Sequence, residues 1–356
     1  MICMMNNTSE QKVWRASAPS NIALIKYMGK LESLGNSPSN SSLSYTLSHL
    51  QSYVELRIKK SSDEADSWLP LERNSLQYFE DALSPSFTIP DLSQQSQNRF
   101  LKHLKFLKDS FEFKGSFEVR SANGFPADCG LASSASSFAA LTKCANLALT
   151  DMTGRKKYTQ IELSDMSRHG SGSSCRSLFA PWAIWNIEGA GPVDLGYSEL
   201  IHQVVVVDST KKKVSSSEAH KRVVSSPLFE NRKERAETRL KELMLALRGK
   251  QWSSSYQIMW SEFWDMQALF ETAKPNFGYL SADSIQVLRW LQENTWETLG
   301  DGPLITMDAG PNVHLLYRLD QRELAEKVQR ELTPMINIFS SYDFESYAKN
   351  SRKKNL

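Results

Sequence analysis

The order of strand-like and helical segments is the feature of this sequence that most limits its fold. Residues 21–27 and 41–58 have the apolar, β-branched and aromatic content of strands. Between later strand-like runs, Phe100, Leu104 and Leu107 recur at helical spacing with lysines among them. Strands and helices are therefore mixed without a strict strand–helix–strand alternation, and this order predicts the α+β fold class.

The second half of the chain differs in character from the first. Three long helical runs dominate it: residues 226–249, 254–273 and 281–296. The last apolar stretch, 303–318, predicts two strands joined at a Gly-Pro-Asn turn. A chain of 356 residues can hold two cores, because single hydrophobic cores stop growing at roughly 250–300 residues. We expect an N-terminal phosphate-binding domain over 1–195, a C-terminal helix-rich domain over 196–345 and a basic tail over 346–356.

Bulk composition excludes several classes of protein. A net charge of +2 gives no sign of a nucleic-acid binder, and no run approaches the roughly 20 apolar residues of a membrane span. The four cysteines, Cys3, Cys129, Cys144 and Cys175, form no C-x-x-C pair, so zinc-ribbon and thioredoxin-like sites lack their spacing. The first 15 residues also lack an apolar signal region. We therefore expect a cytoplasmic protein with incidental thiols.

The stretch FPADCGLASSASSFAALTKC, residues 125–144, places an excess of small and hydroxyl residues just before an alanine-rich helix. One serine would cap such a helix, and the N-terminus of a helix also attracts anions through its N–H groups and dipole. The stretch lacks both the Walker lysine and the G-x-G-x-x-G pattern. It is therefore either a well-capped helix or a phosphate cradle.

A second cluster, HGSGSSCRS, covers residues 169–177 and follows a helix expected to end near Gly170. Alternating glycine and serine let a backbone approach a ligand closely, and Arg176 offers a planar fork for a carboxylate or phosphate. A flexible loop with a surface arginine is the alternative interpretation.

Two further charged residues lie beside apolar strands. Asp308 follows an apolar run and precedes Ala309-Gly310-Pro311, where it could act as a base or stabilise the turn. Lys26 lies between Ile25 and Tyr27, which is an unusual position for a charge without a partner, although a surface lysine could snorkel from it.

Several motifs in a fixed order now show a resemblance to a known family. They are APSNIALIKYMGK, PSNSSLSYTL, FPADCGLASSASSFAAL, GSGSSCRSLF, VSSSEAHKRVVSSPLFENR and MDAGPNVHLL, which lie between Ala18 and Arg318. Together they resemble the diphosphomevalonate decarboxylases, within the superfamily of galactokinase and of homoserine, mevalonate and phosphomevalonate kinases. The GLASSA outline is shared across that superfamily, whereas GSGSSCRS and MDAGPN are particular to the decarboxylase branch.

The resemblance implies a two-domain small-molecule-kinase fold, with an N-terminal half like domain 2 of ribosomal protein S5 and a C-terminal α/β sandwich half. It implies ATP-dependent decarboxylation of (R)-5-diphosphomevalonate to isopentenyl diphosphate, with release of ADP, phosphate and CO₂. ATP as co-substrate and Mg²⁺ are the groups it implies, and the oligomeric state is left open, with a homodimer as one option.

The same resemblance assigns roles to individual residues. The expected catalytic residues are Lys26, Arg176 and Asp308, with Arg176 on the substrate carboxylate and Asp308 beside the 3-hydroxyl. The expected substrate-binding residues are Tyr27, Met28, Gly29, Lys30, Ser171, Gly172, Ser173, Ser174, Cys175, Arg176 and Ser225. The expected ATP-binding residues are Gly130, Leu131, Ala132, Ser133, Ser134, Ala135 and Ser136, with Ser134 also near the metal. Arg99 could be a further basic contact to the substrate.

Two departures from the family pattern and three alternative functions accompany these assignments. Met28 stands where the family has tryptophan, and the segment 31–37 after Lys30 is altered. A decarboxylase of 5-phosphomevalonate, a kinase of the 3-hydroxyl without decarboxylation, and a silent ATP-binding regulator share this fold. The joint presence of Lys26, Arg176 and Asp308 argues against the kinase.

Overall fold

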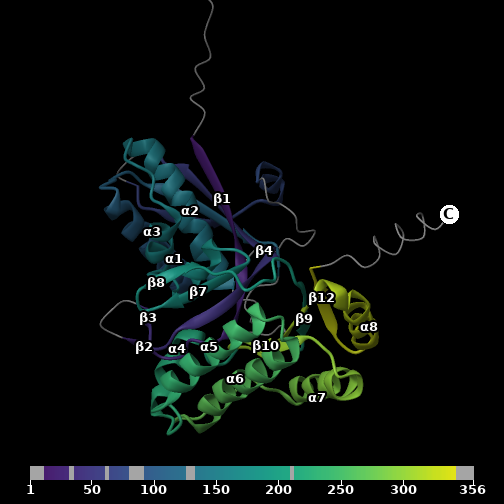
Figure 1. Ribbon diagram of the computed structural model, residues 1–356. Coiled ribbons are helices and arrows are strands. Elements are labelled where there is room, and N and C mark those ends of the chain that lie inside the picture. The colour runs from purple at the N-terminus through teal and green to yellow at the C-terminus, as the bar shows by residue number, and fades with distance from the viewer. Residues whose placement is uncertain are drawn as a thin grey trace, which may run out of the picture.

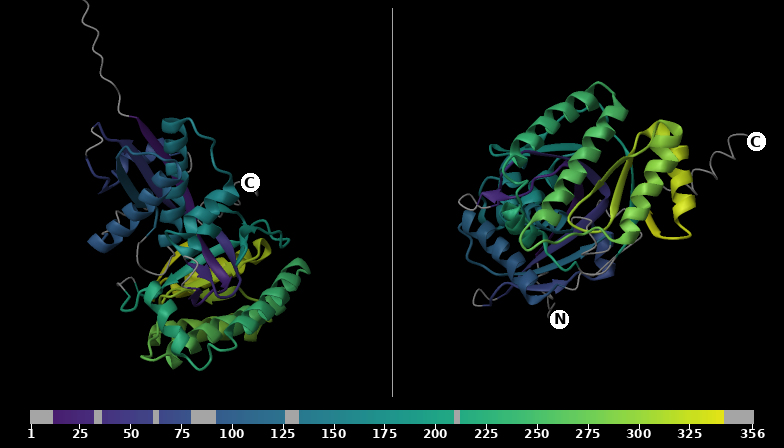
Figure 2. Two further views of the ribbon diagram at one scale, coloured as in Figure 1. Left: turned by 90° about the vertical axis from the view of Figure 1, so that its left-hand side faces the viewer. Right: turned by 90° about the horizontal axis from the view of Figure 1, so that it is seen from below.

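The computed structural model describes residues 12–31, 36–60, 64–79, 92–125, 133–208 and 212–341. Figures 1 and 2 show an N-terminal sheet with its helices above a C-terminal sheet with its own helices. The two long strands β1 (Val13–Ile25) and β4 (Ser42–Ile58) run from the first part into the second. Across the described ranges, no helix is both long and apolar enough to cross a membrane.

The N-terminal sheet has six strands and is built around β4. Its order is β5-β6-β4-β7-β8, and β1 pairs with β4 off this path. The remaining strands are β5 (Ser67–Pro70), β6 (Phe117–Asn123), β7 (Trp182–Asn186) and β8 (Gly189–Pro192), and a separate short hairpin joins β2 (Lys30–Leu31) to β3 (Ser37–Pro38). All pairs in the large sheet are antiparallel except β5 with β6.

The helices α1 (Gln94–Ser110), α2 (Ser133–Thr153) and α3 (Gln160–Arg168) cover this sheet. Helix α2 packs on β1 and β4, and its buried face is rich in alanine, which allows the helix to lie close to the strands. The helix expected to end near Gly170 ends at Arg168, and a 3₁₀ helix, Gly172–Leu178, carries the second serine-glycine cluster.

The C-terminal sheet has four antiparallel strands in the order β10-β11-β9-β12. They are β9 (Ile201–Val206), β10 (Leu304–Met307), β11 (Val313–Tyr317) and β12 (Asn337–Ser340). Its helices are α4 (Ser216–Arg222), α5 (Arg232–Arg248), α6 (Trp252–Thr272), α7 (Ala282–Leu291) and α8 (Arg322–Leu332). Short 3₁₀ turns lie at Val223–Ser225 and Leu319–Gln321, and α7 has a π-helical end at Gln292–Glu297. A further 3₁₀ turn, Arg73–Tyr78, belongs to the N-terminal part. The expected helices and the expected strand pair of this half are all present, and the α+β class is confirmed.

One hydrophobic core joins the two parts. The ends of β1 and β4 contribute Ile22 and Leu43 to the same cluster as Leu243 of α5, Phe263 of α6 and Leu315 of β11. Residues that enter from both sheets are therefore held rigidly with respect to each other. The site described below depends on this shared core.

Helix α5 offers a matched test of that core. Leu243 is fully buried, whereas Leu245, two residues later, is 68% exposed. We expect Leu243→Ala to lower the free energy of unfolding by about 2–5 kcal/mol, because it removes buried methyl groups and leaves a cavity. Leu245→Ala is expected to change it by less than about 0.5 kcal/mol. Denaturant titration of both variants measures the difference, and equal losses would contradict a core centred on this face.

Candidate active site

A buried ion pair lies where the ends of β1 and β10 meet. Lys26 follows β1 directly, Asp308 follows β10 directly, and Lys26 Nζ donates to Asp308 Oδ1 at 2.7 Å. Lys26 is 3% exposed and Asp308 is 27% exposed, so only the carboxylate reaches solvent. The structure therefore brings together two predicted residues that are 282 positions apart.

The pKa values in this pair follow from burial and from charge. Burial acts to raise the pKa of Asp308, but the ammonium of Lys26, with His314 and Arg176, holds that pKa below its usual value. Burial lowers the pKa of Lys26, and the carboxylates of Asp308 and Glu262 oppose that shift. Asp308 is thus a carboxylate at neutral pH that can accept a proton or a hydrogen bond.

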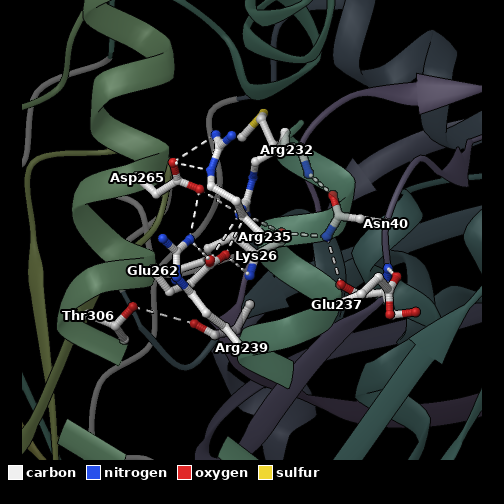
Figure 3. Close-up of polar contacts among 12 residues, drawn as sticks. Lys26, Asn40, Arg232, Arg235, Glu237, Arg239, Glu262, Asp265 and Thr306 are labelled. Atoms are coloured by element: carbon white, nitrogen blue, oxygen red, sulfur yellow. Dashed lines mark hydrogen bonds and ion pairs between the residues drawn. The ribbon is translucent and has the colours of Figure 1, made fainter. Parts of the chain in front are cut away.

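The peptide group of Lys26 is clamped by the helices α5 and α6 (Figure 3). Its N–H donates to Glu262 Oε1 at 2.9 Å, and its C=O accepts from Arg232 Nη2 at 2.9 Å and from Asn40 Nδ2 at 2.9 Å. Glu262 and Arg232 also pair with each other, and both are buried. The backbone that carries the Lys26 side chain is therefore fixed from both sides.

Three arginines of α5 and two carboxylates of α6 form this support, as Figure 3 shows. Arg239 donates to Glu262 at 3.1 Å and to Asp265 at 2.8 Å, while Arg235 donates to Asp265 at 3.0 Å. Spacings of three and four residues place these groups on the facing sides of the two helices. Buried charges are tolerated because each has partners of opposite sign.

Arg176 is buried near the ion pair of Lys26 and Asp308. Among the described residues, its side chain donates hydrogen bonds only to neutral groups. Its Nη1 donates to the hydroxyl of Ser42 at 2.9 Å and its Nε to the amide oxygen of Asn21 at 3.3 Å. Its guanidinium also lies 5.9 Å from the ring centre of Tyr27 and 5.7 Å from that of Trp185. A buried cation held in this way suits an anionic ligand.

A second group of cations surrounds Tyr27. Lys30 donates to the side-chain oxygen of Asn36 at 2.8 Å, and Arg99 donates to the carbonyl of Gly170 at 2.9 Å. Burial and then the charges of Arg99 and Lys221 lower the pKa of Lys30 to about 8. Burial also raises the pKa of Tyr27, so its hydroxyl stays a donor. Positive charges close enough to lower the pKa of Lys30 in this way indicate an anion site.

Two glycines of this region occupy positions that admit no side chain. Gly29 has φ +97°, and a Cβ there would lie 2.6 Å from the ring of Phe229. A Cβ on Gly172 would lie 2.5 Å from the hydroxyl of Tyr27. The backbone N–H of Gly29 donates to His220 Nδ1 at 3.1 Å, and burial followed by the charge of Lys30 lowers the pKa of His220 to about 3.

The remaining predicted residues of the serine-glycine cluster divide into surface and interior groups. Ser173 is partly exposed, and its carbonyl accepts from Asn21. Ser174 is fully buried, because its hydroxyl bonds with Ser167 and with the carbonyl of Ser171. Cys175 is buried as well, and burial raises the pKa of its thiol to about 12. Within this cluster, the buried side chains of Ser174 and Cys175 therefore support the 3₁₀ helix and do not face solvent.

The start of α2 carries the described part of the predicted phosphate loop. Ser134 is exposed and Ser133 partly exposed, whereas Ala135 and Ser136 are buried. The hydroxyl of Ser136 bonds with Ser52 at 2.6 Å and so belongs to the interior. Gly130, Leu131 and Ala132 lie outside the described residues.

Two further predicted residues lie apart from the charged groups. Met28 is buried among apolar side chains of the C-terminal helices, including Phe270. Ser225 is exposed and bonds with the backbone of Arg222 and Lys274. Its described contacts do not include Lys26, Arg176 or Asp308.

Sequence reasoning missed Glu262, Arg232, Lys221 and His220. Arg232 begins a charged run that looks like a solvated helix face, and Glu262 lies within an aromatic helix, WSEFWD. A carboxylate among tryptophans and phenylalanines was the available signal, because burial of a charge requires a partner.

A charge-neutralising change tests the clamp. We expect Glu262→Gln to lower the free energy of unfolding by about 3–5 kcal/mol, because it leaves Arg232 buried with less compensating charge. Glu237→Gln is the matched control: Glu237 accepts from the backbone of Ser41 and makes no contact with Arg232 in the described network. Its loss should stay near 1 kcal/mol, that of one ordinary hydrogen bond. Equal losses in denaturant titrations would contradict the assignment.

The cation group predicts a pH-dependent affinity for anions. Lys30 loses its proton as the pH rises through about 8, and the attraction for an anion falls with it. We expect the affinity for inorganic diphosphate, measured by calorimetry, to decrease between pH 7 and 9. Lys30→Arg keeps its charge in this range and should flatten the profile. An unchanged profile in that variant would remove Lys30 from the anion site.

Comparison with known proteins places this geometry in a family. The diphosphomevalonate decarboxylase-like N-terminal domain matches residues 18–192, and the mevalonate 5-diphosphate decarboxylase C-terminal domain matches 202–355. The diphosphomevalonate decarboxylase of Schizosaccharomyces pombe is 30% identical over 337 residues, which cover 88% of this chain and 81% of that protein. 

Solved structures agree with the sequence comparison. A mevalonate diphosphate decarboxylase from Legionella pneumophila is 46% identical, with a TM-score of 0.83 over 92% of this chain and 100% of the other. MDDEF, solved in complex with MVAPP, AMPPCP and magnesium, is 27% identical, with a TM-score of 0.78 over 93% and 97%. The chain therefore belongs to the diphosphomevalonate decarboxylase family.

Proposed function

We propose that this protein catalyses the ATP-dependent decarboxylation of (R)-5-diphosphomevalonate to isopentenyl diphosphate, with ADP, phosphate and CO₂ as the other products. The observation that carries the proposal is the position of Asp308, paired with Lys26 and within the electrostatic influence of Arg176. The substrate carries a hydroxyl group and a carboxylate close together. The carboxylate of Asp308 can act on the hydroxyl, and Arg176 can bind the substrate carboxylate.

Asp308 acts on the 3-hydroxyl of the substrate. Its pKa is held low by Lys26, so it meets the substrate ionised, and it orients the hydroxyl or takes its proton as the oxygen attacks the γ-phosphorus of ATP. Lys26 keeps the carboxylate in place and balances charge that develops nearby. The phosphorylated oxygen is then a good leaving group.

The two cationic regions bind the two ends of the substrate. Arg176 holds the carboxylate until the carbon–carbon bond breaks, CO₂ leaves, and the electron pair forms the double bond as phosphate departs. Lys30, Arg99 and Tyr27 hold the diphosphate at the other end. The number of cations here favours a diphosphate over a monophosphate.

The start of α2 fits the phosphates of ATP and Mg²⁺. Mg²⁺ is usually held by one or two protein oxygens together with substrate phosphates, and Ser134 presents an exposed hydroxyl at a helix start. We assign Ser133 and Ser134 to the phosphates, with Ser134 toward the metal. Mg²⁺ would neutralise charge on the transferred phosphoryl group.

Two further proposals, on domain division and on location, concern the chain as a whole. We propose a phosphate-binding domain over 1–195, a helix-rich domain over 196–345 and a basic tail over 346–356. We also propose a cytoplasmic location, in keeping with small, highly charged substrates.

An assay with two substrates tests the function. We expect ADP, inorganic phosphate and CO₂ in equal amounts from ATP and diphosphomevalonate, and much slower turnover with 5-phosphomevalonate. Asp308→Asn should keep ATP binding and reduce ADP release by orders of magnitude, since it removes the ionised carboxylate. ADP without CO₂ would indicate a kinase, no ADP a silent regulator, and near-normal turnover of Asp308→Asn would exclude its role.

A further inference from the structure

A row of three histidines crosses the interior on the C-terminal side of the active site. His49 Nε2 lies 3.1 Å from His202 Nδ1, and His202 Nε2 lies 3.0 Å from His314 Nδ1. His202 and His314 are each 1% exposed, and neighbouring ring centres are 5.0 and 5.2 Å apart. The rings are therefore joined nitrogen to nitrogen, in a line that the proposed mechanism does not yet use.

The strand register directs one end of this row toward Asp308. His314 on β11 lies opposite Thr306 on β10, and Asp308 is two residues beyond Thr306. His202 on β9 lies opposite Leu316, two residues from His314. Side chains two residues apart share a face, and diagonal neighbours on adjacent strands are roughly 7–8 Å apart. His202, His314 and the end of β10 thus step across one face, and His314 lies close enough to Asp308 for its protonated form to lower the pKa of that carboxyl.

The other end of the row reaches a surface pocket. In the pairing of β1 with β4, Pro19 faces Gln51 while Ser20 faces Leu47, so residues 48–50 bulge out of β4. His49 lies in this bulge and lines a pocket of about 100 Å³ together with His202 and the exposed Glu199. The pocket gives the far end of the row contact with solvent.

The charge states of His49 and His202 suit tautomer exchange. Burial, followed by the charge of His314, lowers the pKa of His49 to about 4, and burial lowers that of His202 well below 6.5. A neutral imidazole has one N–H donor and one acceptor nitrogen. The relay requires His314 to be neutral as well when the proton reaches it. Three neutral rings can hold their protons in two arrangements, all on Nδ1 or all on Nε2.

We propose that His314, His202 and His49 relay the proton that Asp308 takes from the substrate hydroxyl to the pocket at the surface. The proposal rests on the proposed function, in which the substrates cover the exposed face of Asp308 during the reaction. The proton needs a second way out, and the row begins on the face that Asp308 shares.

The relay balances at every step. The hydroxyl O–H bond breaks and the proton binds Asp308 as the oxygen forms its bond to phosphorus and ADP leaves. The proton then passes to His314 Nε2, and the proposal places one bridging water between the two groups. His314 releases its Nδ1 proton to His202 Nε2, His202 releases its Nδ1 proton to His49 Nε2, and His49 releases its Nδ1 proton to solvent in the pocket. Each ring gains one N–H bond and loses one.

The charged groups around the row are consistent with this direction. At the pocket end, Glu199 is the carboxylate that lines the exit. At the inner end, Asp308 is paired with the ammonium of Lys26 at 2.7 Å. His202 is also fixed through its backbone, because its N–H donates to Ser341 Oγ at 2.8 Å. The ring can then keep its position while its protons exchange.

His202→Gln tests the relay with the hydrogen bonds retained. A glutamine can donate and accept at the same place, but it does not exchange protons between two nitrogens. We expect kcat to fall at least about ten-fold, since positioned proton transfer is worth roughly 10²–10⁴-fold, with KM within about two-fold and a larger solvent deuterium isotope effect. Gln203→Met, on the opposite face of β9, is the control and should keep kcat. A kcat of His202→Gln equal to that of wild type would overturn the relay.

Chemical rescue at the pocket gives a second test, which also covers a variant of His202 that fails to fold. His49→Ala enlarges the pocket by one ring, and we expect added imidazole to restore kcat, whereas 1-methylimidazole, which has no exchangeable N–H, should not. Equal rescue by both, or full activity without either, would overturn the proposal. Failure of the function itself would differ, because wild-type protein would then release no CO₂.

Discussion

The ion pair between Lys26 and Asp308 is the interaction on which the rest of the structure depends. A lysine ammonium that is 3% exposed loses most of its hydration, and the fold must replace it with fixed oxygen atoms. Because the two residues end strands of different sheets, the pair needs the shared core that holds β1, β4 and β10 together. Burial of one charge therefore explains why the two halves are not independent.

The support around Lys26 follows from the same requirement. A carboxylate at Glu262 holds the N–H of Lys26 and opposes the lowering of its pKa, but Glu262 is itself buried and needs Arg232 and Arg239. Asp265 then balances the arginines. Such a network need not make the protein more stable than apolar residues of the same size would. Removal of one member, however, leaves a buried charge without a partner of opposite sign. The network is best understood as a means of fixing the backbone of one residue, Lys26, on both sides.

The sequence predicted the parts of this arrangement that short-range patterns encode. Strand content in 41–58 and the long helical run 254–273 predicted β4 and α6, and motif resemblance placed Lys26, Arg176 and Asp308 in one site. Whether a hydroxyl faces solvent was beyond reach, because Ser134 and Ser136 differ only by their angle around α2.

Long-range pairing was equally beyond reach. The aromatic neighbours of Glu262 in the sequence indicate that it is buried, but its arginine partners are set only when α5 packs against α6, and the three histidines are separated by more than 100 residues at each step. Their alignment depends on a three-residue bulge in β4 and on the order of strands in the second sheet. Neither leaves a local signal, since both are consequences of which strands meet.

The partners of the buried cations separate supporting groups from ligand-binding groups. Arg232 and Arg239 donate to carboxylates, so their charge is already neutralised and they can only hold the structure. Arg176, Lys30 and Arg99 donate to neutral oxygens of side chains or backbone, which fix their positions while leaving their charge uncompensated by those partners. Desolvation makes such a charge costly, and an anionic ligand with a carboxylate at one end and phosphates at the other would remove that cost at both ends.

Lys26 belongs to neither group, because its carboxylate partner is also the residue that meets the reacting hydroxyl. The charge of the pair is therefore neutral before the reaction and positive once Asp308 accepts a proton, which is the moment at which negative charge moves onto the bound phosphates.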